Sequence, residues 1–167
     1  MPKVHDSPNP WIAEHIRRFE ETGGRPRPGV NDLLLTTRGR KTGELRRTAL
    51  LYARDGDRYV LAASNRGAEH HPAWYLNLLA DPYVTVQVGA ETFTARARTA
   101  TAQERPHLWQ LMVSARSEYA AYQQRIAREI PVVLLERVHG PNAAPPGDGS
   151  AVRGGTTTLV VPAATAS

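Results

Sequence analysis

The sequence predicts a mainly β domain of the α+β class: an antiparallel barrel of about six strands with three or more helices outside it. Short apolar runs, several with strict alternation, are separated by Gly and Asp turns, which is typical of strands. Most of these runs are joined by links too short for parallel crossovers. Helical segments interrupt the series in the order helix, three strands, helix, two strands, helix, strand, which favours helices packed outside a barrel.

The composition narrows the class of protein. A chain of 167 residues can bury a core as one domain, and its lack of cysteine excludes disulfides, thiolate metal sites and cysteine nucleophiles. No segment reads as a signal peptide or as a run of apolar residues long enough to span a bilayer, so we expect a cytoplasmic protein. We divide it into an N-terminal helix and linker (1–30), the barrel (31–138) and a disordered tail (139–167).

The N-terminal segment contains one clear helix signal. We expect residues 1–8 to be a flexible lead. Asn9 is a suitable N-cap with Pro10 in the first helical position, and the helix continues to about Thr22, where Gly23 and Gly24 end it. Residues 25–29 then form an extended linker.

The remaining elements follow from periodicity and turn residues. Pro72 opens a helix to residue 80, and Thr101 with Glu104 forms a capping box before a helix that starts near Arg105. A break at 114–117 separates it from a helical piece at 118–128. Strands are expected at 31–37, 45–53, 58–63, 83–88, 91–99 and 132–136.

A basic turn between the first two of these strands is the densest charge cluster. Five cations face one acid, Glu44, within a chain of net charge +5 and pI near 10.0; the cations are Arg38, Arg40, Lys41, Arg46 and Arg47. Such a cluster suits a phosphate or carboxylate ligand, although a solvated hairpin tip has the same composition. The turn is neither a P-loop nor a dinucleotide fingerprint. Without a recognisable nucleic-acid-binding motif, we expect no nucleic-acid partner.

Three other features have both a functional and a structural interpretation. Tyr119 and Tyr122 share a helix face and form either a flat binding wall or part of the core. Adjacent His70 and His71 cannot converge on one ion, so we expect no metal site, exposed histidines and His71 as a cap. Ser64 lacks the surroundings of a hydrolase nucleophile.

Taken in order, these motifs resemble a known family. The succession is GRKTG at 39–43, Arg46, AAS at 62–64, PAWYLNL at 72–78, Asp81-Pro82, YxxYQ at 119–123 and IPVVLLE at 130–136. It resembles the deazaflavin-dependent nitroreductases of actinobacteria, a branch of the split β-barrel flavin and deazaflavin oxidoreductases, over residues 33–136. The resemblance implies an FMN-binding-like split β-barrel and coenzyme F-420, an 8-hydroxy-5-deazaflavin with a phosphate and a polyglutamate tail.

The resemblance also assigns roles to residues. Lys41 and Arg46 match the cations that hold the cofactor phosphate, with Arg38, Arg40 and Thr42 of the same turn near its acidic tail. The segment matching Ala62, Ala63, Ser64 and Asn65 lies beside the deazaflavin ring in relatives, and Trp74 matches an aromatic residue near the cofactor. Tyr119 and Tyr122 match residues of the acceptor pocket. This chain departs from the usual pattern at Asn65-Arg66 and at Arg116.

The implied reaction is hydride transfer from the reduced cofactor to a flat acceptor, a quinone or a nitroaromatic. Ser64, Tyr119 or Tyr122 would donate a hydrogen bond to the oxygen that becomes negative. The alternatives are an FMN-binding oxidoreductase of the same fold, with FMN the less favoured cofactor, and a non-catalytic carrier of cofactor or lipid. The N-terminal helix docks on the barrel or contacts a membrane, with docking preferred, and relatives imply a homodimer.

Overall fold

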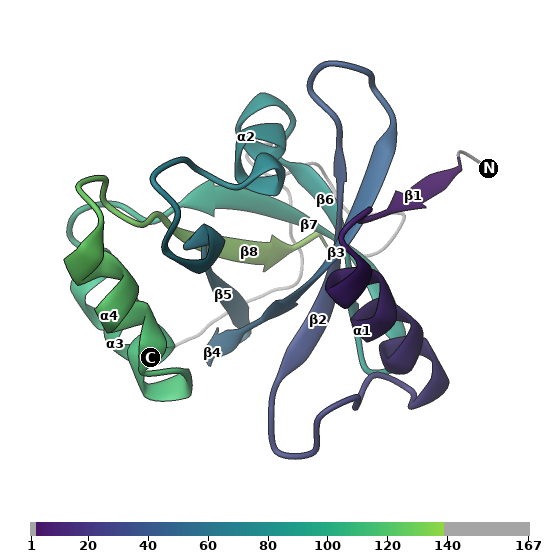
Figure 1. Cartoon of the computed structure of the whole chain (residues 1–167), viewed down its shortest axis with the longest axis horizontal. Helices are drawn as coiled ribbons and strands as arrows, with labels where there is room; N and C mark the ends of the chain where they lie inside the picture. Colours follow the sequence, from purple (N-terminus) through teal and green to yellow (C-terminus); the bar gives the residue numbers. More distant parts are fainter. Residues whose placement is uncertain (1–2, 139–167) are drawn as a thin grey trace, which may run out of the picture. The chain divides into compact units, whose positions relative to one another are not determined.

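We describe the chain from a computed structural model, which defines residues 3–138; the tail expected at 139–167 lies outside the described residues. The strands form one eight-stranded sheet in the order β1-β3-β2-β6-β7-β8-β5-β4 (Figure 1). The strands are β1 (Val4–Asp6), β2 (Asp32–Arg38), β3 (Leu45–Leu51), β4 (Ala53–Asp55), β5 (Arg58–Ala62), β6 (Tyr83–Val88), β7 (Glu91–Thr99) and β8 (Val132–Arg137). The helices are α1 (Pro10–Glu21), α2 (Ala73–Ala80), α3 (Arg105–Ala115) and α4 (Glu118–Arg125), with a 3-10 turn, η1 (Asn65–Gly67).

The predicted α+β class is confirmed, but the sheet has eight strands where about six were expected, and it does not close into a barrel. Part of the expected flexible lead forms β1, which pairs in parallel with β3 from Val4 opposite Leu45. The strand expected at 45–53 divides at Tyr52, because the chain leaves β2 there and β4 pairs with β5 instead. In the part of the chain that the structure describes, β1 and β4 are the two edges and do not pair, so the sheet stays open.

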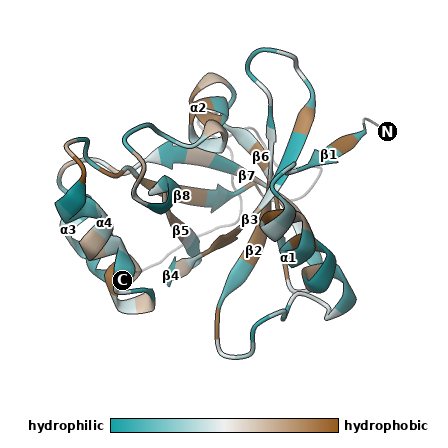
Figure 2. Ribbon diagram, in the orientation of Figure 1, coloured by the Kyte–Doolittle hydropathy of each residue, from teal (hydrophilic) through white to brown (hydrophobic). Residues whose placement is uncertain are grey.

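Strands β2, β5 and β8 are buried on both faces, which explains their long apolar runs, whereas β6 and β7 alternate buried and exposed residues. On one face Leu33 and Leu35 of β2 pack with Leu61 of β5 and with Tyr75 and Leu78 of α2. On the other face the alternate residues of β5 and β8 pack against α3 and α4; they include Val60, Ala62, Val132 and Leu134. Figure 2 shows the matching apolar colour along the strands and the polar outer side of α1.

Helix α1 packs on the sheet through Ile16 and Phe19, which contact Leu34 of β2, and so takes the docked position that was preferred from the sequence. The predicted cap is confirmed, because the Asn9 side-chain oxygen accepts hydrogen bonds from the amides of Trp11 and Ile12. Among residues 3–138, no helix combines the length and apolar character that crossing a membrane requires.

The end of α1 is locked against the β6–β7 turn through a contact that only glycine permits. Gly24 has a φ of +91°, and a Cβ at this position would lie 2.3 Å from the Cα of Gly89. Gly23 also has a positive φ, but no atom lies within 4 Å of its Cβ position. We expect Gly24→Ala to lower the free energy of unfolding by about 2–3 kcal/mol, and Gly23→Ala by about 1 kcal/mol. Urea unfolding of the two variants measures the difference, and equal losses would contradict the contact.

A network of ion pairs joins β7 and β8 to the start of α3. The Arg98 guanidinium donates to both carboxylate oxygens of Glu104, at 2.8 and 2.9 Å, and pairs with Glu136 of β8. Thr101 and Glu104 form the predicted capping box through reciprocal bonds of 2.9 and 3.2 Å. Because Arg98 and the Thr101 amide favour the ionised carboxylate, the pKa of Glu104 falls to about 2.

This lowered pKa predicts a loss of stability in acid. The Glu104 carboxylate stabilises the fold fully above about pH 4.5, and its contribution disappears as the pH falls toward 2. Because the group is partly exposed, we expect the contribution to be about 1 kcal/mol. Unfolding of Glu104→Gln in urea at pH 7 and pH 3 should show a smaller acid loss than the wild type, whereas Glu69→Gln should show the wild-type loss. An unchanged acid loss in Glu104→Gln would contradict this role.

Candidate functional site

A cleft of about 560 Å³ lies where α1, the free edge of β3, η1, the start of α2 and α4 meet. Its lining combines aromatic, cationic and small side chains from segments far apart in the sequence. The polar, aromatic and small lining residues include His15, Arg27, Asp32, Ala62, Ser64, Asn65, Arg66, Trp74, Arg116, Tyr119 and Tyr122. This volume lies within the range typical of sites for small molecules.

The free edge of β3 forms one side of the cleft, along residues 48–51. Strand β1 pairs with β3 only as far as Arg47, whose carbonyl accepts from the Ser7 amide. The amide of Tyr52 donates to the carbonyl of Asn31, at the start of β2. Hydrogen bonds alternate along an antiparallel pair, so the amides and carbonyls of Ala49 and Leu51 point away from β2. Backbone donors and acceptors therefore face the cleft at this edge.

The segment from Ala62 to Gly67 brings small side chains and a sharp turn to the cleft. Ala62, Ala63 and Ser64 are buried, and the chain then turns through two non-glycine residues in the left-handed region, Asn65 at φ 50° and Arg66 at φ 55°. Such conformations cost on the order of 1–3 kcal/mol each and cluster at ligand sites. The Asn65 side chain donates to the His70 carbonyl at 3.1 Å, which helps to fix the turn.

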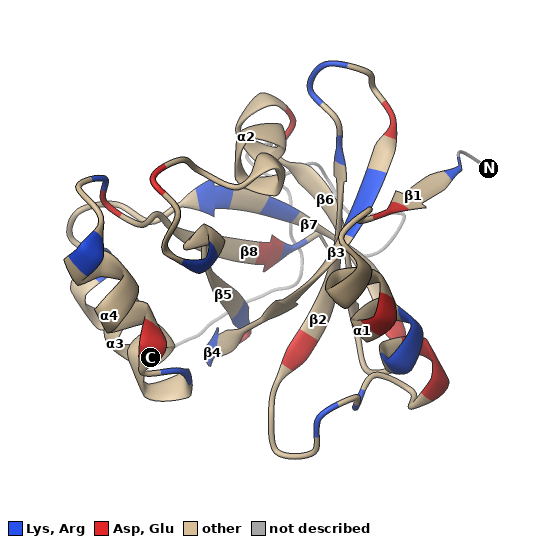
Figure 3. Cartoon of the chain, viewed as in Figure 1, with Lys and Arg blue, Asp and Glu red and all other residues tan. Residues whose placement is uncertain are grey.

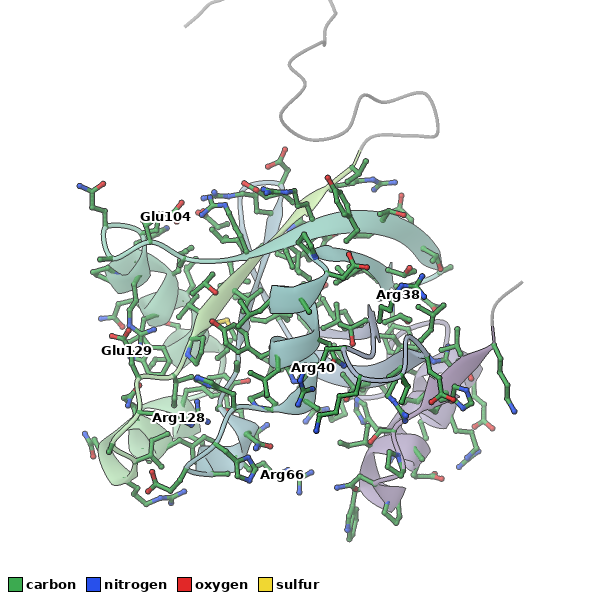
Figure 4. All side chains as sticks on the ribbon, turned by 90° about the horizontal axis from the view of Figure 1, so that it is seen from above. Arg38, Arg40, Arg66, Glu104, Arg128 and Glu129 are labelled. Carbon is green, nitrogen blue, oxygen red and sulfur yellow. The ribbon has the colours of Figure 1, made fainter. Side chains whose placement is uncertain are left out.

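Arg128 holds this segment from behind. Its guanidinium donates to the carbonyls of Ser64 at 2.8 Å, Ala68 at 2.9 Å and Ala63 at 3.3 Å. The guanidinium also contacts His71 Nδ1 at 3.0 Å. The sequence predicted an exposed His71 that caps α2, but His71 is half-buried and α2 has no side-chain cap. Burial lowers the pKa of both Arg128 and His71, which keeps this imidazole neutral beside the cation. Figure 4 shows Arg128 beside the helices α3 and α4.

Helix α4 provides an aromatic wall. Tyr119 is 7% exposed, and its ring meets that of Tyr122 edge-on at 6.3 Å between centroids. Burial raises the pKa of Tyr119, so its phenol stays protonated and acts as a hydrogen-bond donor. Arg116 lies beside this wall and pairs with Glu118 at 2.6 Å. Across the cleft, Trp74 of α2 is half-buried and packs edge-on against Tyr75.

A polar cluster, which we call the His15 cluster (His15, Asp32 and Arg27), faces the cleft from the side of α1. The Asp32 side chain is only 1% exposed and accepts two bonds from Arg27, at 2.5 and 3.1 Å. His15 Nε2 lies 3.4 Å from the same carboxylate. These three residues were not predicted as a site, since His15 lies within the expected N-terminal helix and Arg27 within the expected linker.

The basic turn lies beyond one end of the cleft and does not line it. Thr48 and Leu50 line the cleft, and alternation places Arg46 on the same side of β3, about 7 Å further along the strand. Arg46 pairs with Glu44 at 2.8 Å, whereas within residues 3–138 no carboxylate lies within 4.0 Å of Lys41. Figure 3 shows the cations gathered at the tip of the β2–β3 hairpin. The cleft and the basic turn therefore form one continuous track along β3.

Asn77 of α2 fastens the basic turn. Its carbonyl oxygen accepts from the amide and the guanidinium of Arg40, both at 3.1 Å, and its amide donates to Thr37 at 3.2 Å. Arg38 pairs with Asp81 at 3.6 Å, and the Thr42 hydroxyl accepts from the Glu44 amide. Figure 4 shows Arg40 beside α2, on the same side of the molecule as Arg66.

The structure thus separates the predicted site residues into two groups. The cleft brings together Ala62, Ser64, Asn65, Trp74, Tyr119 and Tyr122. Ala63 is buried behind it. The residues of the basic turn lie outside the cleft, at the end of β2, in the β2–β3 loop and in β3: Arg38, Arg40, Lys41, Thr42 and Arg46. Arg66 joins the first group, and in the described part of the chain no carboxylate lies within 4.0 Å of it.

A separate cavity of about 480 Å³ lies on the other side of His71, between α2, α3 and the start of β8. Its cation, Arg105, is already taken up by the Ile130 carbonyl, Glu129 and the ring of Trp109. This cavity therefore lacks a free charge for an anionic ligand.

Comparisons with known proteins identify the family of this chain. The family model described as F420H(2)-dependent quinone reductase matches residues 11–137. An F420H(2)-dependent quinone reductase of Mycobacterium tuberculosis is 43% identical over 143 residues, which cover 76% of this chain and 96% of the relative.

Two solved structures are similar as well. One, titled as an F420-H2 dependent reductase (FDR-A), is 39% identical with a TM-score of 0.59 over 63% of this chain and 93% of its own. The other, titled a domain-swapped dimer, is 36% identical with a TM-score of 0.61 over 78% and 100%. The chain belongs to the F420H(2)-dependent quinone reductase family.

Proposed function

We propose that this protein binds reduced coenzyme F-420 with its ring in the cleft and delivers the hydride to a quinone held against Tyr119 and Tyr122. Membership of the family identifies the cofactor as coenzyme F-420 and the reaction as an F-420-dependent reduction. The observation that supports this proposal is the cleft itself, which the Ser64–Arg66 turn and the tyrosine wall line side by side.

The residues present fit this cofactor. A flat ring needs small side chains and free backbone groups, which Ala62, Ser64 and the edge of β3 at Ala49 and Leu51 provide. Its phosphate and polyglutamate tail need cations, and Arg66 stands at the cleft without a carboxylate partner among residues 3–138. The basic turn continues this positive track along β3, and we assign the tail to it. The split-barrel relatives suggested by the sequence bind related rings in the same kind of fold.

The bound cofactor supplies a hydride, and the protein supplies position, electrostatics and exclusion of water. Asn65 and Arg66 hold the cofactor from the turn that Arg128 fastens, and Trp74 covers it from α2. The neutral phenol of Tyr119, the phenol of Tyr122 and the Ser64 hydroxyl donate hydrogen bonds to an acceptor oxygen as it becomes negative. A nitroaromatic compound presents similar oxygens and fits the same wall.

The two alternatives account for less. FMN carries a phosphate but no polyglutamate tail, so it leaves most of the basic turn without a partner, and the comparisons favour the deazaflavin. A carrier of cofactor or lipid has no need for hydrogen-bond donors around the acceptor.

The assembly of the protein is a further part of this proposal. The similar structure titled a domain-swapped dimer supports a homodimer. Peripheral membrane contact through α1 stays a prediction. Trp11 lines the cleft and is 78% exposed, so in this prediction it contacts the lipid that dissolves the quinone.

A titration followed by a turnover assay tests the function. We expect the purified protein to quench the fluorescence of coenzyme F-420 in a saturable way, and to oxidise the reduced form when menadione is added. Protein that carries flavin absorbance and ignores the deazaflavin would favour the FMN alternative. Binding without oxidation by any quinone or nitroaromatic compound would favour the carrier.

A further inference from the structure

We infer that His15 is the acid that protonates the quinone oxygen, with Asp32 and Arg27 as the residues that position it. This inference rests on the proposed function, because the cofactor-dependent reduction supplies the hydride. It goes beyond that function by assigning the proton to α1, on the side of the cleft away from the tyrosine wall.

The burial of Asp32 carries the first step. A carboxylate that is 1% exposed must be compensated, and Arg27 compensates it through two bonds to its two oxygens. This pairing fixes the carboxylate at the start of β2, where His15 Nε2 approaches one oxygen at 3.4 Å. Asp32 therefore stands as a rigid acceptor behind the imidazole.

The orientation of the ring is the second step. The Asp32 carboxylate lies nearest to Nε2 of the ring, so Nδ1 is the ring nitrogen left to give and take a proton in the cleft. His15 lines the cleft with 23% of its side chain exposed, enough for a substrate and for exchange with water. Nδ1 is thus the nitrogen available to an acceptor in the cleft.

The position across the cleft is the third step. The His15 cluster lines the same cleft as Tyr119 and Tyr122, from different elements of the fold. A quinone carries two carbonyl oxygens on opposite sides of its ring. One oxygen can then accept hydrogen bonds from the tyrosines while the other meets His15.

The reaction balances with one acid of this kind. Reduction of a quinone to a hydroquinone takes two electrons and two hydrogens, of which one hydride comes from the reduced cofactor, which is thereby oxidised. The quinone oxygen that becomes negative takes a proton from Nδ1 of the His15 imidazolium. Neutral His15 keeps its Nε2–H on the side of Asp32 and recovers the Nδ1 proton from water.

The test is a comparison of His15→Gln with His107→Gln. His107 of α3 is a matched control. Its Nε2 lies 3.3 Å from the carboxylate of Asp55, at the end of β4, but His107 does not line the cleft. We expect His15→Gln to lower kcat with menadione by about 100-fold and to leave the Kd for coenzyme F-420 unchanged, whereas His107→Gln keeps both. In the wild type kcat should fall as the pH rises and the imidazolium is lost, and His15→Gln should lack this fall.

The other charged or titratable groups of the cleft, Arg27, Asp32, Arg66, Arg116, Tyr119 and Tyr122, are unchanged in both variants, so the difference reports on the imidazole. A second readout needs no cofactor. The ring ¹⁵N resonances of His15 should move when menadione is added to the cofactor-free protein, and those of His107 should not.

Asp32→Asn should reduce kcat as well, because the ring loses the carboxylate that positions it. Unchanged kcat and pH profile in His15→Gln, or His15 resonances that ignore menadione, would overturn the inference. In either case wild-type turnover would leave the proposed function intact, whereas a wild type that oxidises no reduced cofactor would sink the function itself.

Discussion

Arg128→Met should lower the free energy of unfolding by about 4 kcal/mol and weaken binding of coenzyme F-420 by about 100-fold. Methionine retains much of the side-chain length but donates no hydrogen bonds. The carbonyls of Ala63 and Ala68 then lose their donor, and the Ser64 carbonyl keeps only the Gly67 amide. Each buried carbonyl left unpaired costs about 1–3 kcal/mol. Without this clamp the left-handed conformations at Asn65 and Arg66 relax, and the turn no longer presents its backbone to the ring.

Urea unfolding and a fluorescence titration with the cofactor measure the two effects. Arg137→Met is the matched control, since this guanidinium pairs with Glu91 at the surface, far along β8 from the turn. It should leave both the stability and the cofactor Kd unchanged, since an exposed ion pair contributes little. Equal behaviour of the two variants would show that Arg128 does not organise the site.

The double variant Lys41→Ala/Arg46→Ala should weaken cofactor binding by about 3–6 kcal/mol, a 10²- to 10⁴-fold rise in Kd, because each contact to an ionised phosphate is worth about 1.5–3 kcal/mol. The fold should keep its stability, since both side chains are exposed. Arg66→Asn should cost about 1.5–3 kcal/mol in binding on its own. Asparagine tolerates the left-handed backbone at this position, so the loss reports on charge and not on strain.

Arg17→Ala controls for net charge, because Arg17 is an exposed residue of α1 that pairs with Glu14 and Glu21. Measurements at two salt concentrations add a second check, since the contribution of exposed cations shrinks with screening. If the double variant binds as tightly as Arg17→Ala, the basic turn is a solvated hairpin tip and the tail of the cofactor lies elsewhere.

Local sequence signals predicted most of the elements for identifiable reasons. The Asn9 cap, the alternation of Val84 and Val86, and the Thr101–Glu104 box each depend on residues within one or two turns of each other. Strand β1 was missed because three exposed residues carry no periodicity, and only the free edge of β3 makes them a strand. The division of β3 from β4 at Tyr52 depends likewise on which partner strand each segment meets.

The site residues, too, could be predicted only where a local pattern or the family resemblance pointed to them. Tyr119 and Tyr122 were predicted from their helical spacing, and Ser64, Asn65 and Trp74 from the family resemblance. No local pattern links His15 to Arg27 and Asp32, because the sheet brings α1 and the linker to the start of β2. An aspartate inside an apolar strand run was the available signal, since a carboxylate there requires a buried partner.

The proposed function depends most on where the cofactor binds. A crystal structure of the protein with coenzyme F-420 tests this position directly. We expect the deazaflavin ring in the cleft against the Ser64–Arg66 turn, beside Tyr119 and Tyr122, with its phosphate toward Arg66 and the basic turn. A ring seated in the cavity beside Trp109 and Arg105, or a phosphate far from β3, would contradict it.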